Sequence, residues 1–398
     1  MPNLAVSNRL AVNYAVESAF GTTPTAGNNK ALRITGETLN FTLKKDSSKE
    51  IRYDRAVADI STLDADAAGS LPFEFSYREY DDFIEAAFQG TWAAFGTAGI
   101  GATFVGSFAP TTITAGAATT GSSAFTTLQK GQWFKLNAPA QPDNGKWLRV
   151  SPSVAPTSTV ITLDALTPLS GTGSSIAGCT IATSRLFNYT TQRSFSIEDQ
   201  FTDISQYLTY RGMVLSKMML DIKSGSFITG SFDFMGKDQV RNTGTQLPGS
   251  TTLSQTFDVL NGVTNIPAVY EGGAALTSTY IKNFTFNLDN STRGQKAIGV
   301  LGNAGIASGT GKVTGKAEMY FADGAMYQKF LDNAQTSLMV QIKDAAGNGY
   351  VITLPKVRYT KGDITAGSLD QDVMVSLEYQ AVLDPVTSYQ CIIDRLGA

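Results

Sequence analysis

The stretch "FSYREYDDFIEAAF", Phe75 to Phe88, predicts the end of a strand followed by a capped helix. Ser76 and Glu79 have the S-x-x-E spacing of a capping box, and Phe75 precedes the cap, where it can pack on Tyr80. The apolar residues that follow recur at i, i+3, i+4, i+7 and i+8, which places them on one helical face: Tyr80, Phe83, Ile84, Ala87 and Phe88. The pattern therefore predicts a short amphipathic helix after a strand.

A second stretch far downstream, "YFADGAMYQKFLDNA", Tyr320 to Ala334, has the same organisation. Asp323 is the expected N-cap, and a second apolar face follows it: Tyr327, Phe330, Leu331 and Ala334. The two caps are 247 residues apart (323 − 76 = 247), and the pairs Tyr80 with Tyr327 and Phe83 with Phe330 share that spacing. The chain therefore contains an internal duplication.

The flanking sequences repeat as well. Before each helix, an alternating strand (around Phe41 or Phe286) leads into a long polar loop and a return strand. After each helix, several strands alternate at period two, as in Met218, Leu220 and Ile222. We predict an α+β, mainly β fold: two tandem antiparallel β-sandwich or barrel domains, each with one short helix, plus a small inserted all-β domain.

Changes in composition give the expected boundaries. Residues 93–186 have a different composition, with three strands around Trp133, Trp147 and Val160 and a turn at Pro142–Gly145. The expected segments are an N-terminal arm (1–30), a first domain (31–92 and 187–237), the inserted domain (93–186), a linker (238–278), a second domain (279–384) and a C-terminal tail (385–398).

The composition excludes several classes of protein. The 398 residues include no histidine, which removes imidazole catalysis and most zinc sites. The net charge of −3 provides no basic patch for nucleic acid, and Cys179 and Cys391 form no CxxC motif. The N-terminus lacks an export signal, and no apolar run is long enough for a membrane helix. We therefore expect no cofactor, no metal, no membrane partner and a cytosolic origin with reduced thiols.

Candidate chemical motifs do not reach the patterns that catalysis or binding requires. Asp81, Asp82 and Glu85 cluster on the first helix, where we expect a solvated face near the helix N-terminus. The loop Gly309–Lys316 fails the P-loop pattern, and the aspartates at 59, 64 and 66 do not follow an EF-hand loop. None of these residues forms a nucleophile–base constellation, so we expect a protein that is not an enzyme.

Five further blocks of the sequence are informative in combination. They are "SNRLAVNYAVESAFGTTP" (7–24), "EIRYDRAVADI" (50–60), "GSLPFEFSYREYDDFIEAAFQGTW" (69–92), "SFSIEDQFTDISQYLTYRGMVLSKMMLDI" (194–222) and "ITGSFDFMGK" (228–237). Together these blocks resemble the major tail tube proteins of long non-contractile-tailed, siphovirus-like bacteriophages. The resemblance covers most of residues 7–240 and, more faintly, the second copy.

The resemblance implies two tail-tube-like domains and a structural role in the virion. Subunits would stack as rings around a lumen that conducts DNA without binding it specifically, with other tail proteins at the tube ends and assembly in the host cytoplasm. Because six such domains make one ring in related tubes, two domains per chain predict homotrimeric rings with pseudo-six-fold symmetry; hexamers are the alternative. By the same analogy the loop 44–68, with Arg52, Asp54, Arg55 and Asp59, would contact the neighbouring ring.

Two other functions stay open at this point. An extracellular β-rich adhesin or surface-layer protein would need an export signal. A tail-associated glycan hydrolase would need carboxylates facing a cleft, and Asp82→Asn or Glu85→Gln would then abolish its activity.

Overall fold

The computed structural model describes residues 4–96, 101, 103–116, 122–276, 280–322 and 324–397, and it is mainly β, as predicted. The N-terminal half contains η1 (Ser7–Arg9), β1 (Leu10–Val16), β2 (Asn29–Leu32), β3 (Asn40–Ser47), β4 (Ile60–Glu74), α1 (Asp81–Phe88), β5 (Ala93–Ala94), β12 (Ser184–Phe187), β13 (Ser194–Phe201), β14 (Gln206–Lys223), β15 (Thr229–Gly236) and β16 (Asp238–Asn242). The C-terminal half contains β17 (Thr251–Thr252), β18 (Val269–Glu271), β19 (Ala274–Ala275), β20 (Ile281–Asp289), β21 (Arg293–Gln295), β22 (Gly305–Ala307), β23 (Lys312–Tyr320), α2 (Ala325–Leu331), β24 (Thr336–Lys343), β25 (Gly349–Thr365), β26 (Met374–Ala381) and β27 (Ile392–Leu396).

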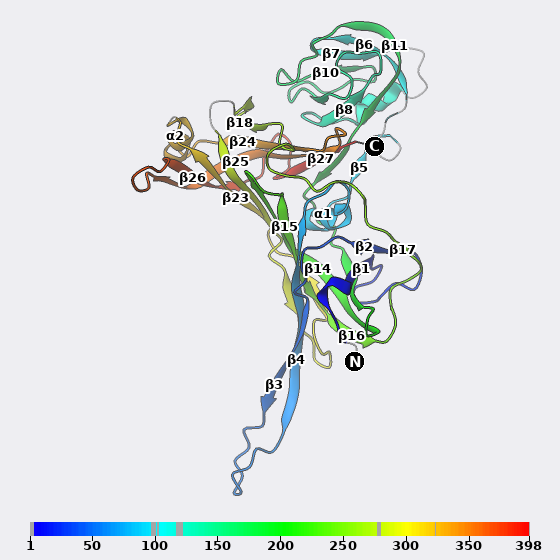
Figure 1. Cartoon of the computed structure of the whole chain (residues 1–398), viewed down its shortest axis with the longest axis vertical. Helices are drawn as coiled ribbons and strands as arrows, with labels where there is room; N and C mark the ends of the chain where they lie inside the picture. The colour runs from blue at the N-terminus through cyan, green and yellow to red at the C-terminus, as the bar shows by residue number, and fades with distance from the viewer. Residues whose placement is uncertain are drawn as a thin grey trace.

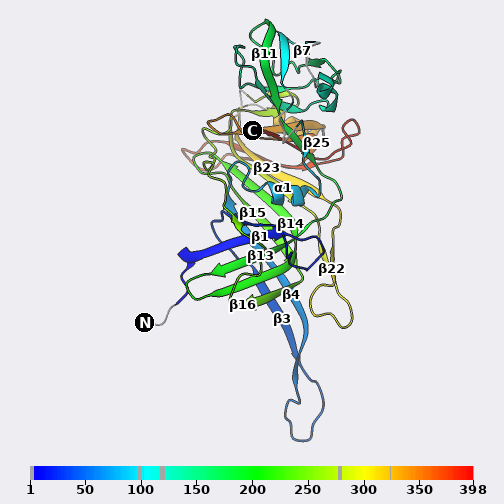
Figure 2. The ribbon, with the colours of Figure 1, turned by 90° about the vertical axis from the view of Figure 1, so that its right-hand side faces the viewer.

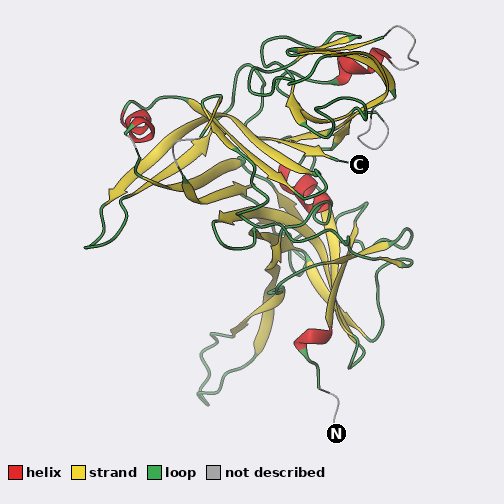
Figure 3. Cartoon of the chain, turned by 45° about the horizontal axis from the view of Figure 1, so that its top comes forward, coloured by secondary structure: helices red, strands yellow, loops and turns green. Residues whose placement is uncertain are grey.

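The two halves repeat one antiparallel topology. In the first repeat, β3 pairs with β4, β4 with β15, β15 with β14 and β14 with β13. In the second repeat, β20 pairs with β23, β23 with β26, β26 with β25 and β25 with β24. Each repeat places its helix after the second strand of this series. Figure 3 shows the helices as short segments among the strands. The duplicated order of strands and helices is therefore present in the fold.

The two repeats share one continuous sheet. Residues 217–223 of β14 pair antiparallel with residues 283–289 of β20, so the fourth strand of the first repeat's series lies beside the first strand of the second repeat's series. Figure 2 shows β23 of the second repeat beyond β14 and β15 of the first repeat along the molecule. A sheet of this size must twist, and the twist turns the second repeat relative to the first.

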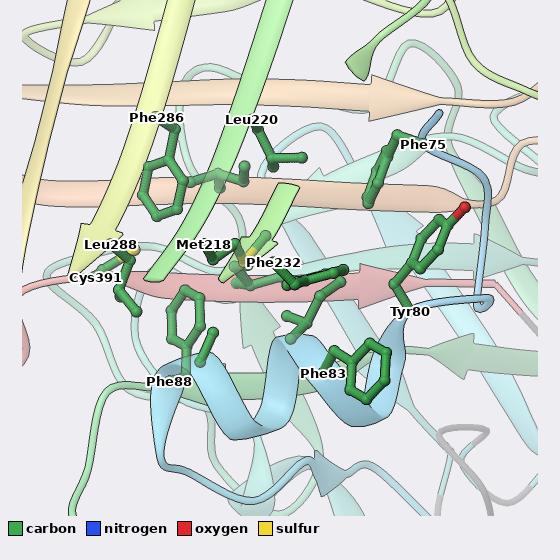
Figure 4. Close-up of a cluster of buried hydrophobic side chains, with 14 of the residues drawn as sticks. Phe75, Tyr80, Phe83, Phe88, Met218, Leu220, Phe232, Phe286, Leu288 and Cys391 are labelled. Carbon is green, nitrogen blue, oxygen red and sulfur yellow. The ribbon is translucent and has the colours of Figure 1, made fainter. Parts of the chain in front are cut away.

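The core lies on one face of this sheet, beneath α1. Phe83 and Phe88 project from the helix towards Phe232 on β15 and Leu288 on β20 (Figure 4). Phe83 and Phe232 form an edge-to-face pair with ring centroids 5.4 Å apart. The predicted face of the first helix is confirmed, since all five of its apolar residues are buried. Because strand residues alternate, the opposite face of the sheet is left to polar side chains.

The helix ends differ from the sequence prediction. The capping box is wrong: α1 begins at Asp81 without a side-chain cap, and Glu79 instead accepts hydrogen bonds from the backbone N–H groups of Arg33 and Gln255 (3.0 and 2.7 Å). Asp323, the predicted second cap, lies outside the described residues. In α2 only Met326 is fully buried, and Leu331, expected on the apolar face, is exposed.

Both helices end in the same hydrogen-bond motif. In α1, Gln89 has a positive φ of 50°, and the N–H groups of Gln89 and Gly90 donate to Ala86 and Glu85. In α2, Asn333 has a φ of 49°, and the N–H groups of Asn333 and Ala334 donate to Phe330 and Lys329. This Schellman motif makes Gln89 the equivalent of Asn333. The predicted equivalence of Phe83 with Phe330 is therefore displaced by three residues, because 333 − 89 = 244.

A separate sheet lies between β5 and β12 in the chain. Its strands are β6 (Phe104–Ala109), β7 (Thr112–Ala115), β8 (Trp133–Asn137), β9 (Trp147–Arg149), β10 (Val160–Thr162) and β11 (Gly173–Ala182), with η2 (Ser122–Thr127) between β7 and β8. The strand order is β10-β7-β6-β11-β8-β9. Two hydrogen bonds attach this sheet to the second repeat. The backbone N–H of Trp133 donates to Asp394 Oδ2, and the indole Nε1 of Trp147 donates to the Gly347 carbonyl, both at 3.0 Å. Figure 1 shows it at the end of the molecule beyond β24 and β27.

Segments expected to be an arm, a linker and a tail contain paired strands. Residues 10–16 form β1, which pairs with β13 along its full length. Residues 238–242 form β16, which pairs with β14. Residues 392–396 form β27, which pairs with both β12 and β25. Arg185 and Asp394 join two of these strands through a buried bidentate ion pair with both contacts at 2.7 Å.

Candidate assembly interface

The carboxylates on and before α1 line a hollow, the kind of position in which catalytic carboxylates occur. The hollow has a volume of about 320 Å³, and Tyr14, Glu79, Asp81, Asp82 and Arg395 line it. Asp81 pairs with Arg395 and accepts a hydrogen bond from Tyr350 Oη at 2.6 Å. The predicted solvated face is therefore wrong, because Asp81 connects the helix to β25 and β27.

The two neighbouring acids are also paired. Asp82 accepts hydrogen bonds from Lys30 Nζ (2.5 Å) and Tyr14 Oη (3.0 Å). Glu85 pairs with Arg193 at 3.2 Å. Each of the three carboxylates is thus paired with a cation from another segment of the chain, and the pairs hold these segments together. In the described residues no group of three or more His, Cys, Asp or Glu side chains could hold a metal ion.

The face of the sheet opposite the helices is polar and carries charges of both signs. Its acidic residues alternate with the core residues of seven strands, and lysines lie among them. The residues are Glu74, Lys217, Asp221, Lys223, Asp233, Asp289, Lys312, Lys316, Glu318, Lys361, Asp363 and Glu378. Burial raises the pKa of Asp221, which lies near the middle of this face. No helix in the described part of the chain is long and apolar enough to cross a membrane.

One end of the continuous sheet is the outer edge of β3. Within the described residues β3 pairs only with β4, so no strand covers its other side. Upstream of β3 the ladder to β4 continues through Thr38, whose N–H donates to Ser70 O (3.1 Å). Leu39 O accepts a hydrogen bond from Tyr210 Oη (3.0 Å) and keeps a second lone pair for another donor. An uncovered edge of this kind is a template for another strand.

The other open edge belongs to the C-terminal part of β25. Residues 361–365 pair with β26 on one side, whereas β24 and β27 pair with β25 only up to Val357 and Thr353. The described residues contain no strand on the remaining side. In the first repeat the equivalent part of β14 has strands on both sides, namely β15 and β20. Within the described residues, residues 361–365 of β25 therefore have no equivalent of the β20 strand that pairs with β14.

The β3–β4 hairpin projects away from the rest of the molecule (Figure 1). It contains the four residues that the sequence analysis assigned to an inter-ring contact. Arg52 and Asp54 form a bidentate pair at the tip (3.0 and 2.8 Å), which lowers the pKa of Asp54. Arg55 occupies a turn with a φ of 60°, and Asp59 accepts hydrogen bonds from Ile60 N and Ser61 Oγ (both 2.8 Å).

The sequence analysis missed the apolar character of this hairpin. Ile51 and Tyr53 at the tip are fully exposed, and further exposed apolar side chains follow at Val57, Ile60 and Leu63. The stretch "EIRYDRAVADI" indicates this apolar character, because apolar residues lie between its charged residues. Exposed apolar side chains gathered on one projection mark an interaction surface.

The equivalent loop of the second repeat, residues 290–311, does not project in the same way. Lys296 Nζ bonds to Asp64 (2.8 Å), Asp66 (2.7 Å) and the Ala65 carbonyl (2.8 Å) at the base of the projecting hairpin. Asn303 Nδ2 donates to Gly236 O at 2.7 Å. The two repeats therefore use the same loop position differently: one loop projects, and the other braces it.

In the described residues the chain therefore combines a duplicated, mainly β fold with two open sheet edges and a projecting hairpin. The chain matches the family model described as "Phage tail tube protein" over residues 7–381, nearly its whole length, and it belongs to this family of structural phage proteins. A search of curated proteins finds no match to the chain.

Proposed function

We propose that this protein assembles with itself into stacked rings that form the tube of a phage tail, the conduit for DNA ejection. The family supports a structural role in the virion tail. The observation that carries the assembly is the pair of open edges: within the described residues, no strand covers the outer side of β3 or the side of residues 361–365 of β25 away from β26. Joining one edge to the other between copies is a heterologous contact, which closes into a ring when the rotation allows.

The duplication supports three chains per ring. Each chain supplies two repeats of the same topology, so three chains give six repeats and a pseudo-six-fold ring. Six chains per ring remain the alternative if the second repeat lies outside the ring. A closed ring removes both open edges and with them the hazard of uncontrolled edge pairing.

Stacking would use the projecting hairpin. Its tip, with Arg52, Asp54, Arg55 and Asp59 beside the exposed Ile51, would contact the ring above or below. The internal pairing of Arg52 with Asp54 leaves the apolar side chains as the larger source of contact energy. Only one such hairpin projects per chain among the described residues, so contacts between rings would follow the three-fold rather than the six-fold arrangement.

The polar face of the sheet would line the lumen. Acidic residues and lysines alternate there, so the wall has no uniformly basic surface that would hold phosphates. DNA would pass without specific binding. Other tail proteins would contact the ring at each tube end, and assembly would take place in the host cytoplasm.

Negative-stain microscopy of purified protein over a range of concentrations tests this function. We expect rings or tubes with a central hole, and image classes with three-fold symmetry. Sedimentation of the same samples gives the mass of the ring. Monodisperse monomers at every concentration and salt condition would contradict the proposal, and a ring mass of six chains would favour the hexamer.

A further inference from the structure

We propose that residues 361–365 of β25 in one copy pair antiparallel with residues 38–42 of the next copy, with Asp363 opposite Asn40. The inference deepens the proposed function and rests on it, because it requires the chain to associate with its own copies. It fixes which strands meet, in which direction and in which register. The contact inside the chain between β14 and β20 provides the template.

Two bulges align β14 with β25. The pairing of β14 with β15 shifts at Ser216, and the pairing of β25 with β26 shifts at Thr360, so these residues correspond (360 − 216 = 144). A second shift lies between Tyr210 and Met213 in β14 and between Leu354 and Val357 in β25, again 144 residues apart. Bulges are fixed features of a strand. Because both bulges of β14 recur in β25 at an offset of 144 residues, they define which residues of the two strands correspond.

A side-chain hydrogen bond aligns β3 with β20. Ser70 N donates to Thr38 Oγ1 at 2.9 Å, and Lys316 N donates to Thr285 Oγ1 at 2.9 Å. The residue just before each donor is a glycine, Gly69 or Gly315, on which a Cβ would collide with the neighbouring backbone. Thr38 therefore corresponds to Thr285, an offset of 247 (285 − 38 = 247).

These offsets convert the internal register into an intermolecular one. Inside the chain, Lys217 lies opposite Asp289, Met219 opposite Asn287 and Asp221 opposite Thr285. Adding 144 to the β14 residues and subtracting 247 from the β20 residues places Lys361 opposite Thr42, Asp363 opposite Asn40 and Thr365 opposite Thr38. The faces also agree, since Leu39 then lies opposite Ile364, both on the core side of the sheet.

Exposed apolar residues mark the surface that this pairing would cover. Ile364 is 42% exposed, whereas Leu220, its equivalent at the internal junction, is 1% exposed because β20 lies beside it. Leu43 is 42% exposed on the other open edge. Pairing would remove both from water, and buried apolar area stabilises the contact.

The helices provide a second, independent match. At the internal junction Asn290, just after β20, donates from Nδ2 to Ala87 O of α1 at 3.0 Å. By the offset of 247, Asn290 corresponds to Leu43; by the shared helix-end motif, Ala87 corresponds to Leu331. Leu43 of one copy would therefore lie against Leu331 of the next, which is 58% exposed in the single chain. Two leucine side chains that are exposed in the single chain would thus pack against each other.

Cysteine cross-linking tests the register. Thr38 N bonds to β4, so by alternation the backbone of Asn40 also faces β4, and Asn40 and Asp363 would form a pair without hydrogen bonds between them. Cα atoms in such a pair are about 4.5 Å apart, within the reach of a disulfide. We expect Asn40→Cys/Asp363→Cys to give disulfide-linked dimers and trimers on non-reducing gels, and each single variant to give none above the background of wild type.

Two matched variants complete the experiment. Met219→Cys/Asn287→Cys is the equivalent pair inside the chain and should close within a monomer; native Cys179 and Cys391 are buried and do not compete. Asn40→Cys/Lys361→Cys shifts the register by two residues, to about 8 Å, and should not cross-link.

The outcomes separate the register from the function. Rings that cross-link at Asn40→Cys/Lys361→Cys, or rings without cross-links at Asn40→Cys/Asp363→Cys, overturn the register and leave the tube function in place. Absence of rings and of intermolecular cross-links at all concentrations, while the internal control closes, overturns both.

Discussion

At the scale of single residues, Asp199 on β13 is a carboxyl group in a costly position. It is almost fully buried, and within the described part of the chain its Oδ1 has no hydrogen-bond partner. Burial, together with the nearby charges of Glu37 and Glu198, raises the pKa of Asp199 to about 8. The unfolded value is about 3.9, so the folded chain binds an extra proton between these two values. Its contribution to stability is complete below about pH 4 and is lost as the pH rises through 8.

Asp199→Asn keeps the shape of the side chain and removes this titration. We expect a flatter dependence of the free energy of unfolding on pH between about 4 and 8, and a variant that is more stable than wild type above pH 8. Urea unfolding at a series of pH values measures both. Glu198→Gln is the contrast: Glu198 accepts hydrogen bonds from Thr209, Thr245 and Gln246, so we expect that variant to lose stability. An unchanged pH slope in Asp199→Asn would contradict the assignment.

At the scale of elements, the tip of the projecting hairpin can be removed without changing the open edge of β3 near Asn40 or the open edge of β25. We replace residues 48–59 by a two-residue Asn-Gly turn, which suits a tight hairpin. Because the ring contacts remain, we expect rings of normal diameter that no longer stack into tubes. Electron microscopy and sedimentation distinguish single rings from tubes.

Two milder variants identify which side chains matter in the hairpin. Ile51→Ser/Tyr53→Ser removes exposed apolar area and should impair stacking more than Arg52→Ala/Asp54→Ala, whose charges already neutralise each other. The reverse order would show that the charged residues make the contact. Loss of the rings themselves in any of these variants would assign the hairpin a role within the ring.

The elements that the sequence predicted well are those with a local signal. The face of α1 and the alternating strands of both repeats follow from spacings within a few residues. The strands β1 and β27 escaped prediction because their pairing is distant: Leu10 meets Phe201, and Ile393 meets Leu186 and Ile352. The capping box failed for a related reason, since Glu79 bonds to Arg33 and Gln255 instead of to its own helix.

The candidate interface was predictable only in outline. Duplication in the sequence indicated repeated contacts, but the open edges of β3 and β25 follow from counting strand partners in the fold. The exposure of Ile51 and Tyr53 likewise depends on how far the hairpin extends from the body. The charged residues of the tip were visible in the sequence, whereas the pairing of Arg52 with Asp54 required the geometry of the turn.

At the scale of the whole molecule, the two open edges differ from each other. This difference limits the size of the oligomer that two edge variants can form when they are mixed. Leu43→Asp places a charge on the β3 edge, and Ile364→Asp with Leu331→Asp does the same for the β25 edge. All three side chains are exposed in the single chain, so the folds should persist while burial of an unpaired charge blocks the contact. Each variant alone should stay monomeric, as measured by light scattering after size exclusion.

A mixture of the two variants retains one intact edge of each kind. If the contact joins β3 of one copy to β25 of the next, the mixture should give dimers and nothing larger, because the two remaining edges are both blocked. An isologous contact through either edge alone would instead let one variant dimerise by itself. Wild-type chains carry both edges intact and should continue to rings. The dimer limit is thus a property of the directed, edge-to-edge contact, and rings in the mixture would show that another surface holds the subunits together.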